Sequence, residues 1–197
     1  TSPATFSYVP LDRPDLVSRG RMNKEGQSMF YASLYPDTNF REICHDIKAG
    51  DEVYLAKWRM KSDASIMVFP VYLPENIDTN VDLSTYMGIN NPVFAEGAMG
   101  DYFRKLSDLF TRTEEDENQR YLCSSFLANY ILKQHGSVRF GNQEFDFKFE
   151  GIIYPSARKG AGEIRFSNIV MPPEIADSSL ELVYVIKGRL KDDLSSV

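Results

Sequence analysis

The sequence has few of the residues that hold metal ions or disulfide frameworks. Its 197 residues include only two cysteines, Cys44 and Cys123, and two histidines, His45 and His135, and they contain no CxxC pair. A structural zinc site therefore lacks ligands, and a disulfide framework is excluded, although a single bridge is not. So few cysteines favour a reduced, cytoplasmic protein.

Long apolar runs and a positive charge balance are also missing. No segment approaches the roughly 20 apolar residues of a membrane-spanning helix, and the first residues lack the basic start and apolar core of a signal peptide. The 22 basic and 28 acidic residues give a net charge of −6, which provides no overall attraction for nucleic acid or an anionic membrane. Because the first residue is not Met, we expect a trimmed chain whose natural form can include an upstream segment.

The composition that remains is that of one folded domain covering residues 1–197. Hydrophobic residues make up 43% and charged residues 25%, which is ordinary for a globular protein of this length. Aromatic and β-branched residues gather in short runs that predict strands. Those runs lie at 29–33, 52–60, 65–72, 138–149, 151–154, 164–170 and 180–187.

Helical patterns separate these runs. One helix is predicted after Asp37, which can cap it, with Phe40, Ile43 and Ile47 on one side and Gly50 at its end. Two more are expected at 101–111 and at 118–134, the latter capped by Gly136. The prolines, glycines, Asn and Asp of residues 74–100 predict a long loop over a cleft. This loop lies within an expected insertion spanning about 74–119. Helices and strands are partly segregated, which predicts an α+β fold with mainly antiparallel pairing, and Pro70 predicts an edge or bent strand.

A basic block precedes the first strand. Residues 19–31 read RGRMNKEGQSMFY and carry three basic residues and two glycines in an otherwise acidic chain. The planar fork of an arginine suits a phosphate or a diphosphate. On charge alone, a solvated loop that leads into the strand is the simpler interpretation.

Two further residues are candidates for chemistry. Glu42 lies beside the apolar stripe of its predicted helix and can point into a cleft at the sheet edge, although a helix carboxylate usually faces solvent. Ser156 and Arg158 follow the strand at 151–154 in a proline turn, and strand ends often carry functional side chains. No GxSxG elbow surrounds Ser156, so a serine hydrolase is only weakly supported.

Taken in order, these blocks resemble the RES domain, a family named for its Arg, Glu and Ser. The resemblance rests on Arg21-Met22-Asn23, Gly26, Phe30-Tyr31, Glu42 and the stretch Gly151–Ser156, and it spans roughly residues 15–185. Members are mostly bacterial toxins that consume NAD, are partnered by an Xre-type antitoxin, and have a fold similar to that of ADP-ribosyltransferase toxins. The family often carries an Asn near the strand after its serine, where this chain has Glu163-Ile164-Arg165-Phe166.

The resemblance implies a role for each matching residue. Arg21 would bind the diphosphate or orient the ribose, Tyr31 would stack on nicotinamide, and Glu42 would face the ribose. Ser156 would hydrogen-bond the substrate and Arg158 would add charge for the phosphates. The catalytic candidates are Arg21, Tyr31, Glu42 and Ser156, and the substrate-binding candidates are Asn23, Lys24, Tyr154 and Arg158.

The acceptor in the reaction stays open. Water would give hydrolysis, inorganic phosphate would give phosphorolysis, and a protein side chain would give ADP-ribosylation. NAD is expected as substrate, with no prosthetic group and no metal, and a protein antitoxin is the expected partner. The alternatives are a catalytically silent RES-like interaction module of a larger chain, and a generic α+β domain in which the motifs match by chance.

Overall fold

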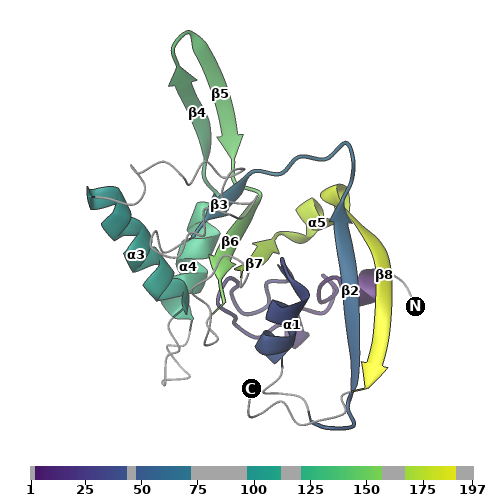
Figure 1. The fold of residues 1–197 in the computed structure, drawn as a ribbon. Coiled ribbons are helices and arrows are strands. Elements are labelled where there is room, and N and C mark those ends of the chain that lie inside the picture. Colours follow the sequence, from purple (N-terminus) through teal and green to yellow (C-terminus); the bar gives the residue numbers. More distant parts are fainter. Residues whose placement is uncertain (1–2, 44–47, 72–96, 112–120, 157–166, 190–197) are drawn as a thin grey trace.

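Four strands form the central sheet, in the order β1-β7-β6-β3 (Figure 1). The computed structural model describes residues 3–43, 48–71, 97–111, 121–156 and 167–189. The sheet consists of β1 (Phe30–Ser33), β7 (Ser167–Met171), β6 (Gly151–Pro155) and β3 (Val68–Pro70). Pairing is antiparallel except between β3 and β6, which run parallel.

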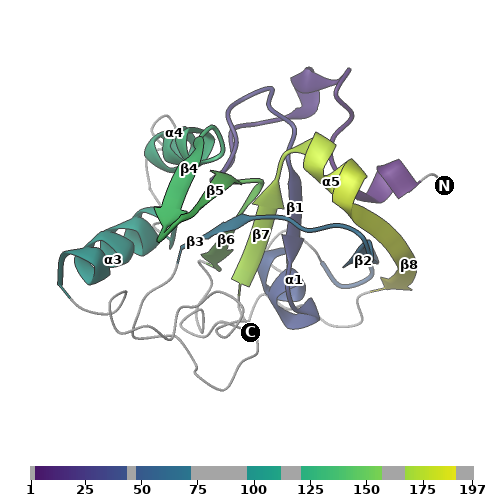
Figure 2. The ribbon, with the colours of Figure 1, turned by 90° about the horizontal axis from the view of Figure 1, so that it is seen from above.

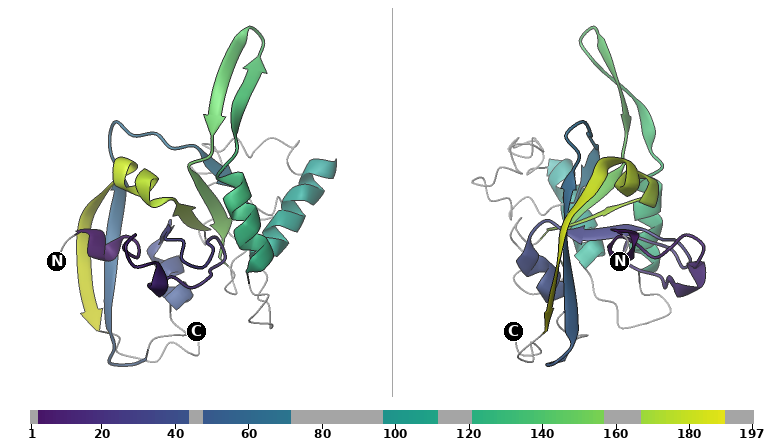
Figure 3. Two further views of the ribbon diagram at one scale, coloured as in Figure 1. Left: turned by 180° about the vertical axis from the view of Figure 1, so that it is seen from behind. Right: turned by 90° about the vertical axis from the view of Figure 1, so that its right-hand side faces the viewer.

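Two antiparallel ribbons flank this sheet. The long one pairs β2 (Glu52–Met60) with β8 (Leu180–Arg189) and has a register shift between Lys57 and Trp58. The other pairs β4 (His135–Phe140) with β5 (Gln143–Lys148). Figure 3 shows this hairpin projecting away from the rest of the described structure.

The helices lie around the central sheet. They are α1 (Pro36–Ile43), α3 (Gly97–Thr111), α4 (Leu122–Ile131) and α5 (Pro173–Ser179), with two 3₁₀ turns, η1 (Pro3–Phe6) and η2 (Pro14–Leu16), near the start. Figure 2 shows α3 and α4 together on one side of the sheet. Helix α1 follows β1 directly and lies against it. No helix of the described segments has the length and apolar character needed to cross a membrane.

The alternation of side chains along the strands produces a hydrophobic cluster on each face of the sheet. On one face Ile152 and Val170, which are paired across β6 and β7, pack with Leu106 and Phe110 of α3 and with Met22. The opposite face packs Phe30 and Met171 against Ala176 of α5. Trp58 of β2 meets the ring of Phe30 edge-on, at 5.5 Å between ring centroids, and so joins the long ribbon to the sheet.

The α+β class and its mainly antiparallel pairing are confirmed. The predicted strand at 52–60 matches β2, the helix predicted at 101–111 lies within α3, and Pro70 ends β3 at the edge of the sheet. The strands expected at 29–33, 65–72, 151–154, 164–170 and 180–187 are found with shifted ends. Residues 74–96 and 112–119 of the expected insertion lie outside the described residues, as do Cys44, His45, Ile47 and Arg158.

Several expected boundaries were wrong. Helix α1 starts at Pro36 rather than after Asp37, because proline fits the first helical position. Residues 97–100, expected in a loop, form the first turn of α3. The helix expected at 118–134 ends at Ile131, so Gly136 is not its cap but the second residue of β4.

The region 138–149 was also predicted incorrectly, as a single strand. It holds a hairpin that turns at Gly141-Asn142, where Gly141 has φ +61 and supplies the left-handed residue of the turn. Gly-Asn between two apolar runs is a recognisable hairpin signal. Helix α5 was missed because a seven-residue helix is too short for a clear apolar period.

Candidate functional site

Polar residues gather on one face of the sheet, near the end of β6. The register pairs Asn168 of β7 with Ser33 of β1 on one side and with Tyr154 of β6 on the other. Residues paired in this way share a face, and so does Ser156, two residues beyond Tyr154. The sheet therefore brings together residues from three strands that are far apart in the sequence.

Glu42 of α1 reaches this row and is held there by two donors. Its Oε1 accepts a hydrogen bond of 2.6 Å from Ser156 Oγ and one of 2.8 Å from Asn168 Nδ2. Hydrogen bonds to a carboxylate are roughly twice as strong as neutral ones. Neither bond uses Oε2, so the pair fixes the carboxylate while leaving its second oxygen to other partners.

A third polar residue fixes the amide of Asn168. Ser33 Oγ donates to Asn168 Oδ1 at 2.7 Å. Because the amide oxygen accepts from Ser33, the amide nitrogen is turned toward Glu42. Ser33, Asn168 and Glu42 thus form a directed chain of hydrogen bonds.

The basic block forms an ordered loop beside this chain. The hydroxyl of Tyr31 donates to Asn23 Oδ1 at 2.7 Å and accepts from the backbone N–H of Met22 at 3.2 Å. Both amide protons of the buried Asn23 are donated in turn, to the carbonyls of Ser18 and Lys24. Asn23 therefore shapes the loop around Tyr31 from the inside, while Lys24 and Glu25 of the same loop are exposed.

Tyr31 is anchored at its hydroxyl, although the residue is partly exposed. Burial raises the pKa of Tyr31 well above its usual value, and the nearby backbone N–H and Arg21 only partly oppose this. The phenol is therefore neutral at physiological pH, with its proton committed to Asn23. The residue as a whole is nevertheless 40% exposed.

Arg21 has a buried hydrogen-bond donor that no described residue satisfies. Its Nε is buried and has no hydrogen-bond partner within the described part of the chain. Its guanidinium carbon lies 5.3 Å from the centroid of the Tyr121 ring, which is within cation–π range. A buried polar atom without a partner is costly, so an acceptor supplied by a ligand would stabilise this donor.

Tyr154 shows that these groups share one environment. Burial raises the pKa of this phenol well above its usual value, Tyr31 and Glu42 raise it further, and Arg21 opposes them. The sheet register gives its position directly: Tyr154 lies opposite Asn168, whose side chain donates to Glu42.

The structure thus brings together six of the eight candidates from the sequence. Lys24 is exposed, with no side-chain bond recorded in the described residues. Sequence reasoning missed Ser33, Asn168 and Tyr121. Asn168 had a visible signal, because it is a polar residue in the apolar strand SNIVM and stands two residues after the stretch at 163–166 where an asparagine was expected.

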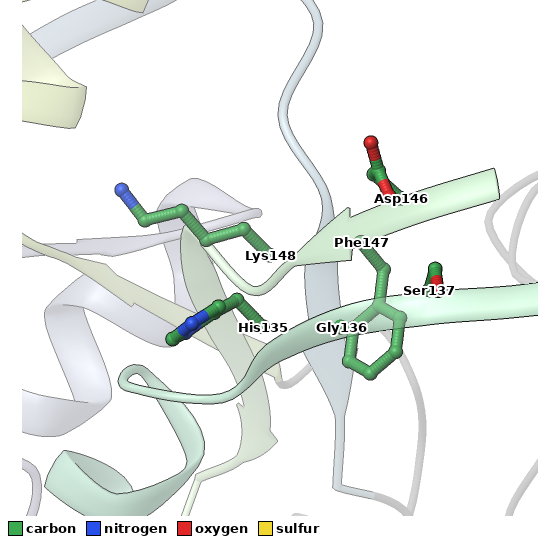
Figure 4. A pocket seen from close by; sticks show the side chains of 6 residues that line it. All are labelled: His135, Gly136, Ser137, Asp146, Phe147 and Lys148. Atoms are coloured by element: carbon green, nitrogen blue, oxygen red, sulfur yellow. The ribbon is translucent and has the colours of Figure 1, made fainter.

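A shallow pocket lies elsewhere, at the base of the projecting hairpin (Figure 4). It is lined by His135, Gly136, Ser137, Asp146, Phe147 and Lys148. Cross-strand pairing places His135 beside Lys148 and Ser137 beside Asp146. None of the candidate site residues lines it.

Comparisons with protein families, with curated proteins and with solved structures find no match. The geometry of the site therefore carries the functional argument.

Proposed function

We propose that the protein cleaves the nicotinamide–ribose bond of NAD, as its resemblance to the RES domain implies. The observation that supports this best is the hydrogen bond between Ser156 and Glu42, at 2.6 Å, across 114 positions of sequence. A chance match of short motifs gives no reason for the glutamate and the serine to meet. In the proposed role the enzyme acts like a toxin, depletes cytoplasmic NAD, arrests growth and is restrained by a protein antitoxin. An ADP-ribosyltransferase-like fold belongs to the same proposal.

The chemistry needs a fixed negative charge more than it needs an acid. When the bond between ribose and nicotinamide breaks, its electron pair goes to the pyridinium nitrogen, so nicotinamide leaves as a neutral molecule. Positive charge develops on the ribose, and a preorganised carboxylate stabilises it. Glu42, held by Ser156 and Asn168, supplies that carboxylate without having to reorganise.

The rest of the site supports binding of the substrate. The Nε of Arg21, which has no partner among the described residues, is a donor suited to one of the diphosphate oxygens of NAD. Tyr31 is 40% exposed, and in the proposed role its ring stacks on nicotinamide. Because Tyr31 has committed its own proton to Asn23, its contribution is stacking rather than acid catalysis.

The reaction product identifies the acceptor. We would incubate the purified protein with NAD, with and without inorganic phosphate, and follow NAD loss and product mass. ADP-ribose formed without phosphate indicates that water attacks the anomeric carbon and loses a proton to solvent. A phosphorylated ADP-ribose indicates phosphorolysis, and a mass increase on a protein indicates ADP-ribosyl transfer. No NAD loss under any condition would remove the enzymatic proposal.

One observation favours the alternative of a catalytically silent interaction module. Helix α4 carries an exposed apolar stripe at four-residue spacing, formed by Leu122, Phe126 and Tyr130 at 48%, 64% and 57% exposure. Apolar surface of this kind often marks a binding surface. In this alternative the hydrogen bonds that join Glu42 to Ser156 and Asn168 only stabilise the fold. The purified protein would then neither consume NAD nor bind it.

Removing the Ser33 hydroxyl tests the chain of hydrogen bonds that leads to Glu42. In Ser33→Ala the amide of Asn168 loses the bond that orients it, and we expect kcat for NAD cleavage to fall by about threefold to tenfold. Ser33→Thr keeps the oxygen and should restore most of the activity. Equal kcat values for Ser33→Ala and the wild type, measured by nicotinamide release, would show that Ser33 does not act on the site.

The close approach at Gly20 offers a test of the basic loop. A Cβ on Gly20 would collide with Asn23 Oδ1 and lie 3.3 Å from the hydroxyl of Tyr31. Gly20→Ala is therefore expected to displace both side chains, to destabilise the fold by about 1–3 kcal/mol and to raise the KM for NAD.

A matched control for Gly20→Ala is Gly141→Ala in the hairpin turn. It has a positive φ and open space around it, so it costs stability of about 1 kcal/mol without touching the site. Loss of NAD affinity in both variants alike would assign the effect to general destabilisation.

A further inference from the structure

Tyr121 has a strained backbone at the edge of the site. Its φ of 62° and ψ of 9° are left-handed, and among the described residues no other side-chain-bearing residue has a positive φ. A bulky residue rarely adopts this conformation. Tyr121 precedes α4, and its carbonyl accepts from Ser125 N at 2.9 Å. Glycine or asparagine would start the helix here with less strain.

The ring of Tyr121 explains why a tyrosine occupies this position. It lies under the guanidinium of Arg21, 5.3 Å from ring centroid to guanidinium carbon. This contact links Tyr121 to the basic loop, in which Met22, next to Arg21, donates its backbone N–H to the hydroxyl of Tyr31. Strain that persists at such a position is typical of functional sites.

We propose that Tyr121 is a positioning residue that holds Arg21 flat for an anionic ligand. The aromatic ring fixes the plane of the guanidinium, so that the buried Nε keeps one direction in which to donate. The inference rests on the proposed function, because it takes the diphosphate of NAD to be that anion. Tyr121 acts on binding through Arg21 and does not touch the bond that breaks.

Three variants of Tyr121 separate the ring from the backbone strain. Tyr121→Ala and Tyr121→Gly both remove the ring, but only glycine adopts the left-handed conformation freely. We expect both to bind inorganic diphosphate and NAD on the order of tenfold more weakly, with a raised KM and a kcat within about twofold of the wild type. The Gly variant should have the higher Tm of the two. Tyr121→Phe keeps the ring and should restore binding.

The control is Tyr130→Ala, which removes an exposed tyrosine from the other end of α4 and is expected to change neither affinity. Diphosphate binding is measured by calorimetry and NAD cleavage by nicotinamide release. An active wild type with unchanged affinities in Tyr121→Ala overturns this inference alone. The inference is also overturned if Tyr121→Ala lowers kcat without changing KM, or if Tyr121→Gly is no more stable than Tyr121→Ala.

The wild type itself tests the proposed function separately. A wild type that is inert toward NAD, but binds diphosphate more tightly than Tyr121→Ala, overturns the proposed function and supports the role of Tyr121. A wild type that binds neither ligand overturns both.

Discussion

Glu42→Gln is expected to lower kcat for NAD cleavage by about 10²- to 10³-fold while leaving the protein folded. Glutamine keeps the length of the side chain and an oxygen that can accept from Ser156 Oγ and Asn168 Nδ2, which now donate to Glu42 Oε1. What it removes is the negative charge that, in the proposed function, stabilises the developing positive charge of the ribose. The loss should therefore appear in kcat, with the KM for NAD changed much less.

The comparison variant for this test is Glu174→Gln, which neutralises an exposed carboxylate in the first turn of α5. It should retain full activity. Nicotinamide release gives the rates, and thermal unfolding shows whether the fold is intact. A Glu42→Gln enzyme that keeps wild-type kcat would sink the assignment. In cells, expression of the wild type should deplete NAD and arrest growth, whereas Glu42→Gln should do neither.

The position of Glu42 was within reach of sequence reasoning, but its partners were only partly so. Helical spacing placed Glu42 beside the apolar stripe of its helix and allowed it to point toward the sheet edge. Ser156 followed from its place after an apolar strand. Asn168 depended on strand register, because a one-residue slip of β7 would turn it to the other face. Ser33 depended on a pairing across 135 positions, which no local pattern reveals.

The remaining differences also have local causes. The hairpin at Gly141-Asn142 was missed because aromatic residues on both sides of the turn gave one continuous strand-like signal. The Tyr121 conformation could not be predicted, since a tyrosine carries no preference for a positive φ. Only the second case is a conflict between local propensity and the observed conformation, and it lies at the candidate site, where such conflicts are expected.

Arg21→Met is expected to raise the stability of the protein and to abolish its binding of NAD. Methionine has a similar length, no charge and no donor, so it removes the buried Nε that has no partner in the described residues. Relieving an unsatisfied buried donor is worth about 1–3 kcal/mol, and the lost contact with Tyr121 costs about 0.5–1 kcal/mol. The free energy of unfolding should therefore rise by about 1 kcal/mol, or about 2–4 °C in Tm for a chain of this size.

The affinity for NAD, in contrast, should fall in Arg21→Met. A saturating ligand that binds only the folded wild type raises its stability, by about 2.7 kcal/mol at a concentration of 100 times Kd. NAD should raise the Tm of the wild type in this way and leave that of Arg21→Met unchanged. Arg59→Met, which breaks an exposed ion pair with Glu181, is the control and should alter stability by less than about 0.5 kcal/mol and leave the NAD response intact.

The two measurements on Arg21→Met decide between a structural and a ligand-binding arginine. An arginine kept for the fold would make the ligand-free variant less stable, since its contact with Tyr121 would have been the reason for its presence. An arginine kept for a ligand leaves the empty site with an unsatisfied donor, and the anion restores the balance when it binds. Only a ligand-binding arginine predicts that the variant has a higher Tm without NAD and no Tm shift when NAD is added. A destabilised variant that still responds to NAD would instead assign Arg21 to the fold.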